Sequence, residues 1–178
     1  KEYPDRFFDC GIAEGNMISV AAGLAAAGKT VFASSFAMFA AGRAFEQVRN
    51  SVGYPHLNVK IGATHAGITV GEDGATHQCL EDIALMRTIP GMTVVCPSDA
   101  IEARAAVEAA IKTYGPFYLR FGRFAVENVN DRPDYRFELG KGVLMRDGTD
   151  VTIIATGIMV GIALEAAKLL ENENISAK

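Results

Sequence analysis

The chain has 178 residues, of which 49% are hydrophobic and 21% charged, and its formal net charge is −4. These values are typical of a globular protein, and they argue against a disordered chain and against a nucleic-acid-binding protein, which needs a basic surface. No apolar run approaches the roughly 20 residues that span a bilayer, and the amino terminus lacks a secretory signal pattern, so we expect a cytoplasmic protein that does not bind membranes.

Short apolar runs alternate with alanine-rich segments along most of the chain. The apolar runs predict strands at 6–11, 30–35, 58–64, 92–97 and 116–121. The segments between them predict helices at 13–28, 38–52, 79–89 and 98–114. Ser98 or Asp99 is the expected N-cap of the last helix. This alternation predicts an α/β fold, with a mostly parallel sheet and helices on both of its faces.

A polar stretch, Val126 to Gly140, separates this region from the remainder. Beyond it, residues 142–157 have the pattern of a β-hairpin that turns at Asp147–Gly148, and residues 158–174 predict a single helix. A hairpin with one helix cannot bury a core of its own. We therefore expect a first domain, a linker and the truncated start of a second α/β domain, at 1–127, 128–138 and 139–178.

The stretch GLAAAGKT, Gly23–Thr30, matches the phosphate-loop pattern GxxxxGK[ST]. A phosphate loop follows a strand and opens a helix, whereas this stretch closes a predicted helix and leads into a strand. Gly28 is better explained as the C-cap of that helix, with Lys29 beside the negative end of the helix dipole. We interpret the match as a coincidence.

Two segments carry chemistry expected of a functional site. Glu14 lies in the first turn of a predicted helix just after a strand, where parallel sheets place ligand crevices, although an acid there also stabilises the helix dipole. The loop 65–78 follows another predicted strand and contains His65, Asp73 and His77. The spacing of its side chains matches no compact zinc pattern, and the three cysteines are far apart with no CxxC motif, so we expect no metal ligands.

Aromatic and arginine side chains flank these segments. Phe36 and Phe39 follow the strand predicted at 30–35, and aromatic residues at such a spacing usually pack in a core. Arg120 and Arg123 lie at the end of the strand predicted at 116–121, where an arginine can clamp a phosphate. Taken alone, each arginine is better explained as a surface charge.

Five segments, in this order along the chain, together resemble the transketolase family of thiamine diphosphate enzymes. They span residues 9 to about 125 and read GIAEGNM, SFAMF, ATHAGITVGEDGATHQ, RTIPGMTVVCPSDAIEARAA and FYLRFGR. The portion GEDGATHQ is highly specific. The resemblance is to the pyrimidine-binding domain and implies its thiamine diphosphate-binding fold, while the carboxyl-terminal part resembles the start of the family's C-terminal domain.

The resemblance implies how this chain would bind the cofactor. Glu14 would hydrogen-bond the ring nitrogen N1′ of the aminopyrimidine and thereby assist removal of the proton from the thiazolium C2 carbon. Phe39 would stack on the pyrimidine ring, and Phe36 would line the same pocket.

The resemblance also implies the substrate contacts. His65 and His77 would hydrogen-bond the hydroxyl groups of a sugar and shuttle protons, and Asp73 would bind a substrate hydroxyl. Arg123 would contact the substrate phosphate, with Arg120 as a weaker candidate. The implied reaction is transfer of a two-carbon ketol unit from a ketose phosphate to an aldose phosphate.

In this family the cofactor's diphosphate is held through a magnesium site built on Gly-Asp-Gly, a motif that this sequence does not contain. We therefore expect half of a cofactor site, as in the separately encoded C-terminal subunit of a split transketolase or in a fragment of a longer enzyme. Activity would require an N-terminal partner chain that holds thiamine diphosphate and Mg²⁺ or a similar metal. The assembly would be a homodimer or a heterotetramer.

Two departures from the family pattern keep alternatives open. Ala13-Glu14-Gly15 replaces the common Arg-Glu-His and leans towards the relative that makes deoxyxylulose phosphate from pyruvate, whereas His65 and the loop GEDGATHQ favour transketolase. Ala66 stands where the family has an acid, which affects substrate detail. The alternatives are an oxo-acid-using subunit and a non-catalytic assembly subunit, for which loss of Glu14 would have been the sign.

Overall fold

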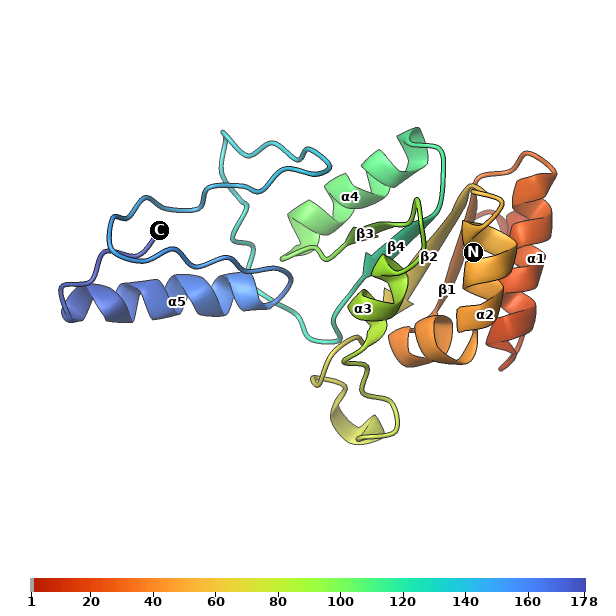
Figure 1. Cartoon of the computed structure of the whole chain (residues 1–178), viewed down its shortest axis with the longest axis horizontal. Helices are drawn as coiled ribbons and strands as arrows, with labels where there is room; N and C mark the ends of the chain where they lie inside the picture. Colours follow the sequence, from red (N-terminus) through yellow and green to blue (C-terminus); the bar gives the residue numbers. More distant parts are fainter. Residues whose placement is uncertain (1) are drawn as a thin grey trace.

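A four-stranded parallel sheet forms the centre of the molecule in the computed structural model, which describes residues 2–178 (Figure 1). The strands pair in the order β1-β2-β4-β3, and each pairing is parallel. They are β1 (Val31–Phe36), β2 (Val59–Thr64), β3 (Thr93–Val95) and β4 (Phe117–Arg120). The predicted α/β fold with a parallel sheet is confirmed.

Helices precede, connect and follow the strands along the chain, as the alternating pattern predicts. They are α1 (Glu14–Ala26), α2 (Phe45–Gln47), α3 (Asp82–Arg87), α4 (Ala100–Lys112) and α5 (Met159–Asn172). The short α2 lies between two π-helical turns, Met38–Arg43 and Val48–Gly53, so the helix predicted at 38–52 is present but wound more loosely than an α-helix. None of the helices described between residues 2 and 178 has the length and apolar character needed to cross a bilayer.

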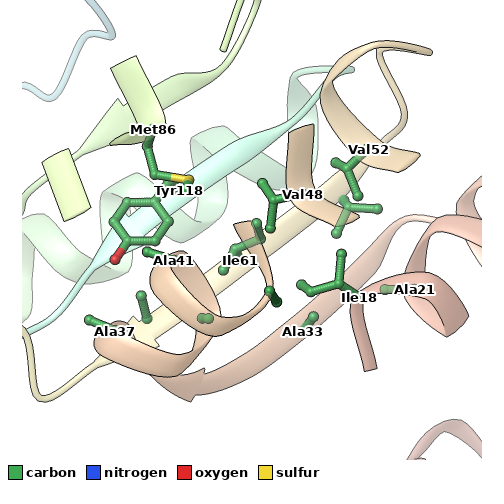
Figure 2. Close-up of a cluster of buried hydrophobic side chains, with 14 of the residues drawn as sticks. Ile18, Ala21, Ala33, Ala37, Ala41, Val48, Val52, Ile61, Met86 and Tyr118 are labelled. Carbon is green, nitrogen blue, oxygen red and sulfur yellow. The ribbon is translucent and has the colours of Figure 1, made fainter. Parts of the chain in front are cut away.

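The two faces of the sheet are covered by different helices, so the prediction of helices on both faces holds. Side chains from α1, α2 with its flanking turns, and α3 meet one face, where Ile18, Val48, Ile61, Met86 and Tyr118 are fully buried (Figure 2). On the other face, α4 packs Ala106 and Ala110 against Phe117 and Leu119 of β4. Burying one large aliphatic or aromatic side chain contributes about 1.5–3 kcal/mol, and these clusters hold the helices on the sheet.

The ends of α1 and α4 follow their sequence signals. Gly28 has φ +85° and donates to Ala25 O at 2.9 Å, and Lys29 donates to Leu24 O at 3.1 Å. This paired arrangement satisfies the last carbonyls of α1, so GLAAAGKT is a helix terminus and not a phosphate loop. At the start of α4, Asp99 is the N-cap, since its Oδ1 accepts the backbone N–H of Glu102 at 2.8 Å.

Lys60 is a buried cation near the start of β2. Its Nζ donates to Thr113 O at 2.8 Å and to Gly115 O at 2.6 Å, just beyond the carboxyl end of α4, and it lies 4.2 Å from the ring centroid of Phe117. Carbonyl oxygens at a helix end carry partial negative charge and favour a cation. Lys60 therefore connects the central strand to the end of the helix that covers it.

The strand predicted at 6–11 is wrong. A 3₁₀ turn occupies Pro4–Arg6, Phe7 and Phe8 are at least half exposed, and Asp9 Oδ1 accepts the N–H of Gly11 at 2.9 Å. This local turn, with Gly11 at φ +64°, bends the backbone away from an extended path. The aromatic residues favour a strand, but the Asp9 side chain accepts the N–H of Gly11 two residues on and forms a local turn instead.

The hairpin predicted at 142–157 is also wrong. Instead, the backbone around Val151 runs parallel to the segment at Ala177. Lys178 donates to Val151 O at 2.8 Å, and Ile153 donates to Lys178 O at 2.7 Å. The apolar run after Asp150 therefore pairs with a segment that follows α5 in the sequence, as in a strand–helix–strand unit. The turn at Asp147–Gly148 does not fold this run back on residues 142–146. In Figure 1 this unit (blue) lies to one side of the sheet.

Candidate functional site

The candidate residues gather at the carboxyl edge of the sheet, where open parallel sheets bind ligands. β1 ends at Phe36 and β2 ends immediately before His65. Helix α1 runs back towards the start of β1, so the beginning of α1 lies beside the end of β1. There, Ser35 Oγ donates to Glu14 Oε1 at 3.3 Å.

Glu14 is a buried carboxylate, with 6% of the residue exposed. Burial is the largest influence on the pKa of the Glu14 carboxyl, and it raises this pKa. Hydrogen bonds from its own backbone N–H, from Arg43 and from Ser35, together with the charge of Arg43, lower the pKa by more. The net result is a pKa of the Glu14 carboxyl below its usual value. Arg43 Nη1 donates to Glu14 Oε2 at 2.9 Å and forms an ion pair with it. As the structure stands, Glu14 is therefore ionised at neutral pH.

Arg43 also lies on an aromatic ring. Its guanidinium carbon is 4.4 Å from the ring centroid of Phe39, a distance suited to a cation–π contact. The rings of Phe39 and Phe36 are nearly parallel, with an angle of 11° and a centroid separation of 6.2 Å. Arg43 thus connects the carboxylate of Glu14 to a pair of phenylalanine rings.

Both loop histidines pack on this aromatic pair. The ring of His65 lies on that of Phe36, and His77 meets Phe39 edge-on with centroids 5.1 Å apart. The Nδ1 of each histidine lies within hydrogen-bond distance of the preceding threonine hydroxyl, 3.0 Å for His65 and 2.9 Å for His77. These contacts orient the imidazoles and bring an acid, two aromatic rings and two histidines into one continuous cluster.

The backbone of the loop 65–78 is held in place at both ends. Gly67 and Cys79 form an antiparallel bridge, with N–H to carbonyl distances of 2.9 and 3.1 Å. His65 has φ +56°, a left-handed conformation that a side chain with a Cβ disfavours. Such strain persists only where surrounding contacts impose it, and it gathers at functional sites.

Asp73 lies outside the cluster. It ends the 3₁₀ turn Gly71–Asp73 at the tip of the loop, and its side chain is exposed. The structure therefore places Asp73 on the same loop as the two histidines but not in contact with the aromatic pair.

Arg120 is engaged by a buried acid that sequence reasoning missed. Arg120 Nε donates to Asp82 Oδ2 at 2.8 Å, and the hydroxyl of Tyr118 donates to the same oxygen at 2.8 Å. Arg120 Nη2 also donates to Cys79 O at 3.4 Å, at the base of the loop. Burial, and secondarily the neighbouring Asp82, raise the pKa of the Tyr118 hydroxyl, so it stays a donor. This network holds the base of the loop, and it pairs the charge of Arg120 with Asp82.

Arg123 contacts the tip of the same loop. Its Nη2 donates to Glu72 Oε2 at 2.8 Å, and a hydrogen bond from the backbone N–H of Glu72, followed by the charge of Arg123, lowers the pKa of the Glu72 carboxyl. Gly71 has φ +83°, a left-handed conformation that favours glycine, and a Cβ there would lie 2.6 Å from Arg123 Nη1 and push that side chain aside. Arg123 is about one-third exposed and stands apart from the histidine cluster.

Arg43 and Asp82 are two of the residues at the site that sequence reasoning missed. Arg43 follows Phe39 by four positions, a spacing that puts both on one side of a helical turn and could have indicated their contact. Asp82 had a weaker signal, because an acid in the first turn of a helix is usually explained by the helix dipole.

Two grooves lie away from the cluster. One, of about 860 Å³, runs along β1 and α1 beneath residues 5–11, and the other, of about 490 Å³, lies between α5 and residues 141–157. Across residues 2–178, no group of three His, Cys, Asp or Glu side chains is arranged to hold a metal ion. Glu14, Phe36, Phe39, His65 and His77, which form the acid–aromatic–histidine cluster, line neither of these two grooves.

Comparison with known proteins gives two family-model matches. The model described as "Transketolase, pyrimidine binding domain" matches residues 1–128, and the one described as "Transketolase, C-terminal domain" matches residues 140–178. The chain covers about half the length of the curated relatives described next.

Two curated relatives and one solved structure are similar over nearly the whole chain. A "Putative transketolase C-terminal section" from Methanocaldococcus jannaschii is 54% identical over 100% of this chain and 57% of its own length. A 6-deoxy-6-sulfo-D-fructose transketolase subunit from a Clostridium species is 47% identical over 100% of this chain and 55% of its own length. A structure described as "Split gene transketolase, inactive beta4 tetramer" is 56% identical, with a TM-score of 0.89, and covers 98% of this chain and 56% of its own.

Proposed function

This chain belongs to the transketolase family, and we propose that it is the pyrimidine-binding part of a transketolase that transfers a two-carbon ketol unit between sugar phosphates. The observation that carries the proposal is the continuous cluster formed by Glu14, Phe39, Phe36, His65 and His77. It combines a buried acid, a flat apolar surface and two proton carriers at the ligand-binding edge of the sheet.

The residues present suit the aminopyrimidine of thiamine diphosphate. Glu14 and Phe39 already accommodate a flat, nitrogen-rich cation, the guanidinium of Arg43, which donates to the carboxylate and lies on the ring. A protonated aminopyrimidine has the same two requirements, an acceptor for N–H and an apolar face. When bound, thiamine diphosphate supplies the carbanion chemistry of the reaction at its thiazolium carbon.

This chain's own residues would bind, orient and move protons. Glu14 would hold or release a proton opposite a ring nitrogen, and Phe36 and Phe39 would form the apolar wall that keeps water from that carboxyl. His65 and His77, on the neighbouring loop, would hydrogen-bond sugar hydroxyls and carry protons as the carbon–carbon bond breaks and forms.

Three further residues would bind the rest of the substrate. Asp73 would bind a sugar hydroxyl, and Arg123 would contact the phosphate after exchanging its pairing with Glu72. We assign Arg120 a supporting place, because its charge is already met by Asp82.

A second chain would complete the site, since the family's diphosphate anchor is absent from this sequence. We propose an N-terminal partner that holds the diphosphate and Mg²⁺ or a similar divalent metal, and an assembly that is a homodimer or a heterotetramer. The similar structure described as an inactive tetramer of one split-gene subunit supports this requirement for a partner. The three cysteines, all free thiols, support a reducing compartment such as the cytoplasm.

Reconstitution tests the proposal. The full-length chain, its N-terminal partner, thiamine diphosphate and Mg²⁺ are combined, and ketol transfer from xylulose 5-phosphate to ribose 5-phosphate is measured. We expect transfer with both chains, none with either chain alone, and a loss of at least about 100-fold in kcat for Glu14→Ala, the usual size of an acid–base contribution. Glu108→Gln, a change at an exposed acid of α4, is the matched control. Full activity of the Glu14→Ala variant would rule out the mechanism.

The oxo-acid-using subunit is the second candidate, and Gly15 after the acid favours it. The common family pattern has a histidine at this position. A Cβ at Gly15 would lie 3.2 Å from Gln47 Oε1, so a histidine here would have to displace the Gln47 side chain. Consumption of pyruvate with release of carbon dioxide by the reconstituted complex, without ketol transfer, would favour this candidate. A complex that binds its partner but catalyses neither reaction would support the non-catalytic assembly subunit.

A further inference from the structure

Arg43 occupies the two groups that we assign to the aminopyrimidine. Its Nη1 donates to Glu14 Oε2 at 2.9 Å, and its guanidinium carbon lies 4.4 Å from the centroid of Phe39. The other aromatic neighbours of Phe39, Phe36 and His77, approach the same ring. A second flat group could take the position on Phe39 next to Glu14 only if Arg43 left it.

The chemistry of the two groups explains the competition. A guanidinium is planar, delocalises its charge and presents N–H donors in its own plane, which suits both a carboxylate and an aromatic face. The aminopyrimidine is also planar and has an N–C–N edge of the same kind. Arg43 therefore satisfies the same acceptor and the same ring face by the same two interactions.

We propose that Arg43 is a placeholder for the aminopyrimidine, which displaces it on binding, so that Arg43 weakens rather than strengthens the binding of thiamine diphosphate. This inference rests on the proposed function. It assigns Arg43 a role distinct from that of Glu14, which would gain a ligand in the same event.

The surroundings of Arg43 allow it to leave. Its side chain is 51% exposed, whereas that of its partner Glu14 is 7% exposed, so the arginine can turn into solvent and the acid cannot. It ends the π-helical turn Met38–Arg43 and lies at the rim of the cluster. Before the cofactor binds, its charge compensates a buried carboxylate that would otherwise lack a cation.

Calorimetry on the reconstituted complex tests the placeholder. Thiamine diphosphate is titrated, with Mg²⁺ in excess, into complexes containing the wild-type chain, Arg43→Gln, Arg43→Lys or Arg49→Gln. Exposed ion pairs and cation–π contacts are modest, so we expect the Kd of Arg43→Gln to fall about three- to tenfold. Arg43→Lys keeps the charge without the planar group, so its Kd should lie between those of wild type and Arg43→Gln. Arg49 is an exposed arginine whose side chain donates to the neighbouring Asn50; Arg49→Gln is the matched control and should leave Kd unchanged.

The second readout follows Arg43 itself. With ¹⁵N-arginine in this chain, the side-chain Nε–H signal of Arg43 should be shifted by the ring current of Phe39 and should move towards the position of Arg49 as thiamine diphosphate is added. A Kd that is unchanged or higher in Arg43→Gln, or an Arg43 signal that does not move, overturns the placeholder while leaving the proposed function intact. A wild-type complex that binds no thiamine diphosphate overturns the proposed function and the placeholder together.

Discussion

The imidazole of His65 lies on the ring of Phe36, with the centroids 3.9 Å apart and the planes inclined by 17°. Phe36 is the last residue of β1 and His65 the first residue after β2, so this stack joins the ends of two neighbouring strands. It also joins the acid–aromatic side of the cluster to the loop 65–78. The side chains that we assign to the cofactor and to the substrate are thus in direct contact.

Replacing Phe36 by leucine should release His65. Aromatic stacking adds about 0.5–1.5 kcal/mol beyond burial, and we expect the free energy of unfolding in urea to fall by about 1 kcal/mol. The ring protons of His65 should lose their ring-current shift in the NMR spectrum. Phe32→Leu, a change at an exposed residue on the same strand, is the control, and a His65 spectrum that is the same in Phe36→Leu and wild type would contradict the stack.

The left-handed backbone at His65 predicts a difference between two variants that both remove the imidazole. At φ +56°, alanine retains the clash of its Cβ with the backbone, whereas glycine does not. His65→Gly should therefore be more stable than His65→Ala by about 1 kcal/mol, which chemical denaturation measures. The reverse order would show that the backbone at this position relaxes. The same pair of changes at Ser34, within β1, should favour alanine.

The network of Asp82, Tyr118 and Arg120 should be costly to disrupt. Asp82→Ala removes the partner of a mostly buried guanidinium and should lower the free energy of unfolding by about 3 kcal/mol. Tyr118→Phe removes one hydrogen bond to a carboxylate and should cost about 2 kcal/mol. Tyr114→Phe, at an exposed tyrosine, is the control and should change stability little. Equal effects of Tyr118→Phe and Tyr114→Phe would contradict the network.

Lys60 should make stability depend on alkaline pH. Burial lowers the pKa of the Lys60 ammonium from 10.5 to about 8. Between pH 8 and 10.5 the unfolded chain keeps this proton while the folded chain loses it, so the unfolded state binds more protons and the free energy of unfolding rises with pH. At 1.36 kcal/mol per pKa unit, the rise attributable to Lys60 is at most about 3 kcal/mol.

The variant Lys60→Met isolates this contribution. Tyrosine and cysteine groups also titrate in the same range, so the relevant quantity is the difference in stability between wild type and Lys60→Met, measured by denaturation from pH 7 to 10.5. As the pH rises, the free energy of unfolding of wild type should increase relative to that of Lys60→Met. A difference that is constant with pH would show that Lys60 keeps its proton in the folded state. Lys112→Met, at an exposed lysine of α4, is the control.

Much of the fold was predictable because local signals and tertiary packing agree. β2 combines Val59, Ile61 and Ala63 on one face, as expected of a buried strand. Gly28 and Asp99 mark a helix end and a helix start in ways that depend on neighbouring residues alone. The segment at 6–11 could not be assigned correctly, because its aromatic content favours a strand while Asp9 forms a local turn. The hairpin failed for another reason: the partner of Val151 is Ala177, beyond a whole helix, and no local pattern names a distant partner.

The candidate site was predictable to a similar extent. The resemblance selected Glu14, Phe36, Phe39, His65 and His77, and the structure brings them together. It also selected Asp73, Arg120 and Arg123. Asp73 lies at the loop tip, Arg120 pairs with Asp82, and Arg123 pairs with Glu72. The charges that neutralise Glu14 and Arg120 escaped sequence reasoning, because an ion pair depends on which side chains meet in space and not on a motif.

The bridge between Gly67 and Cys79 divides the loop into two parts with different freedom. His65 precedes the bridge and His77 stands two residues before its far side, so both histidines are fixed by the closed neck of the loop. Residues 68–78 lie between the bridged residues, with 68–76 forming the tip of the loop, and lengthening such a tip costs little once the bridge closes the loop. Under the proposed function, exchange of the tip, with its Glu72 and Asp73, would change the substrate contacts while His65 and His77 keep their place.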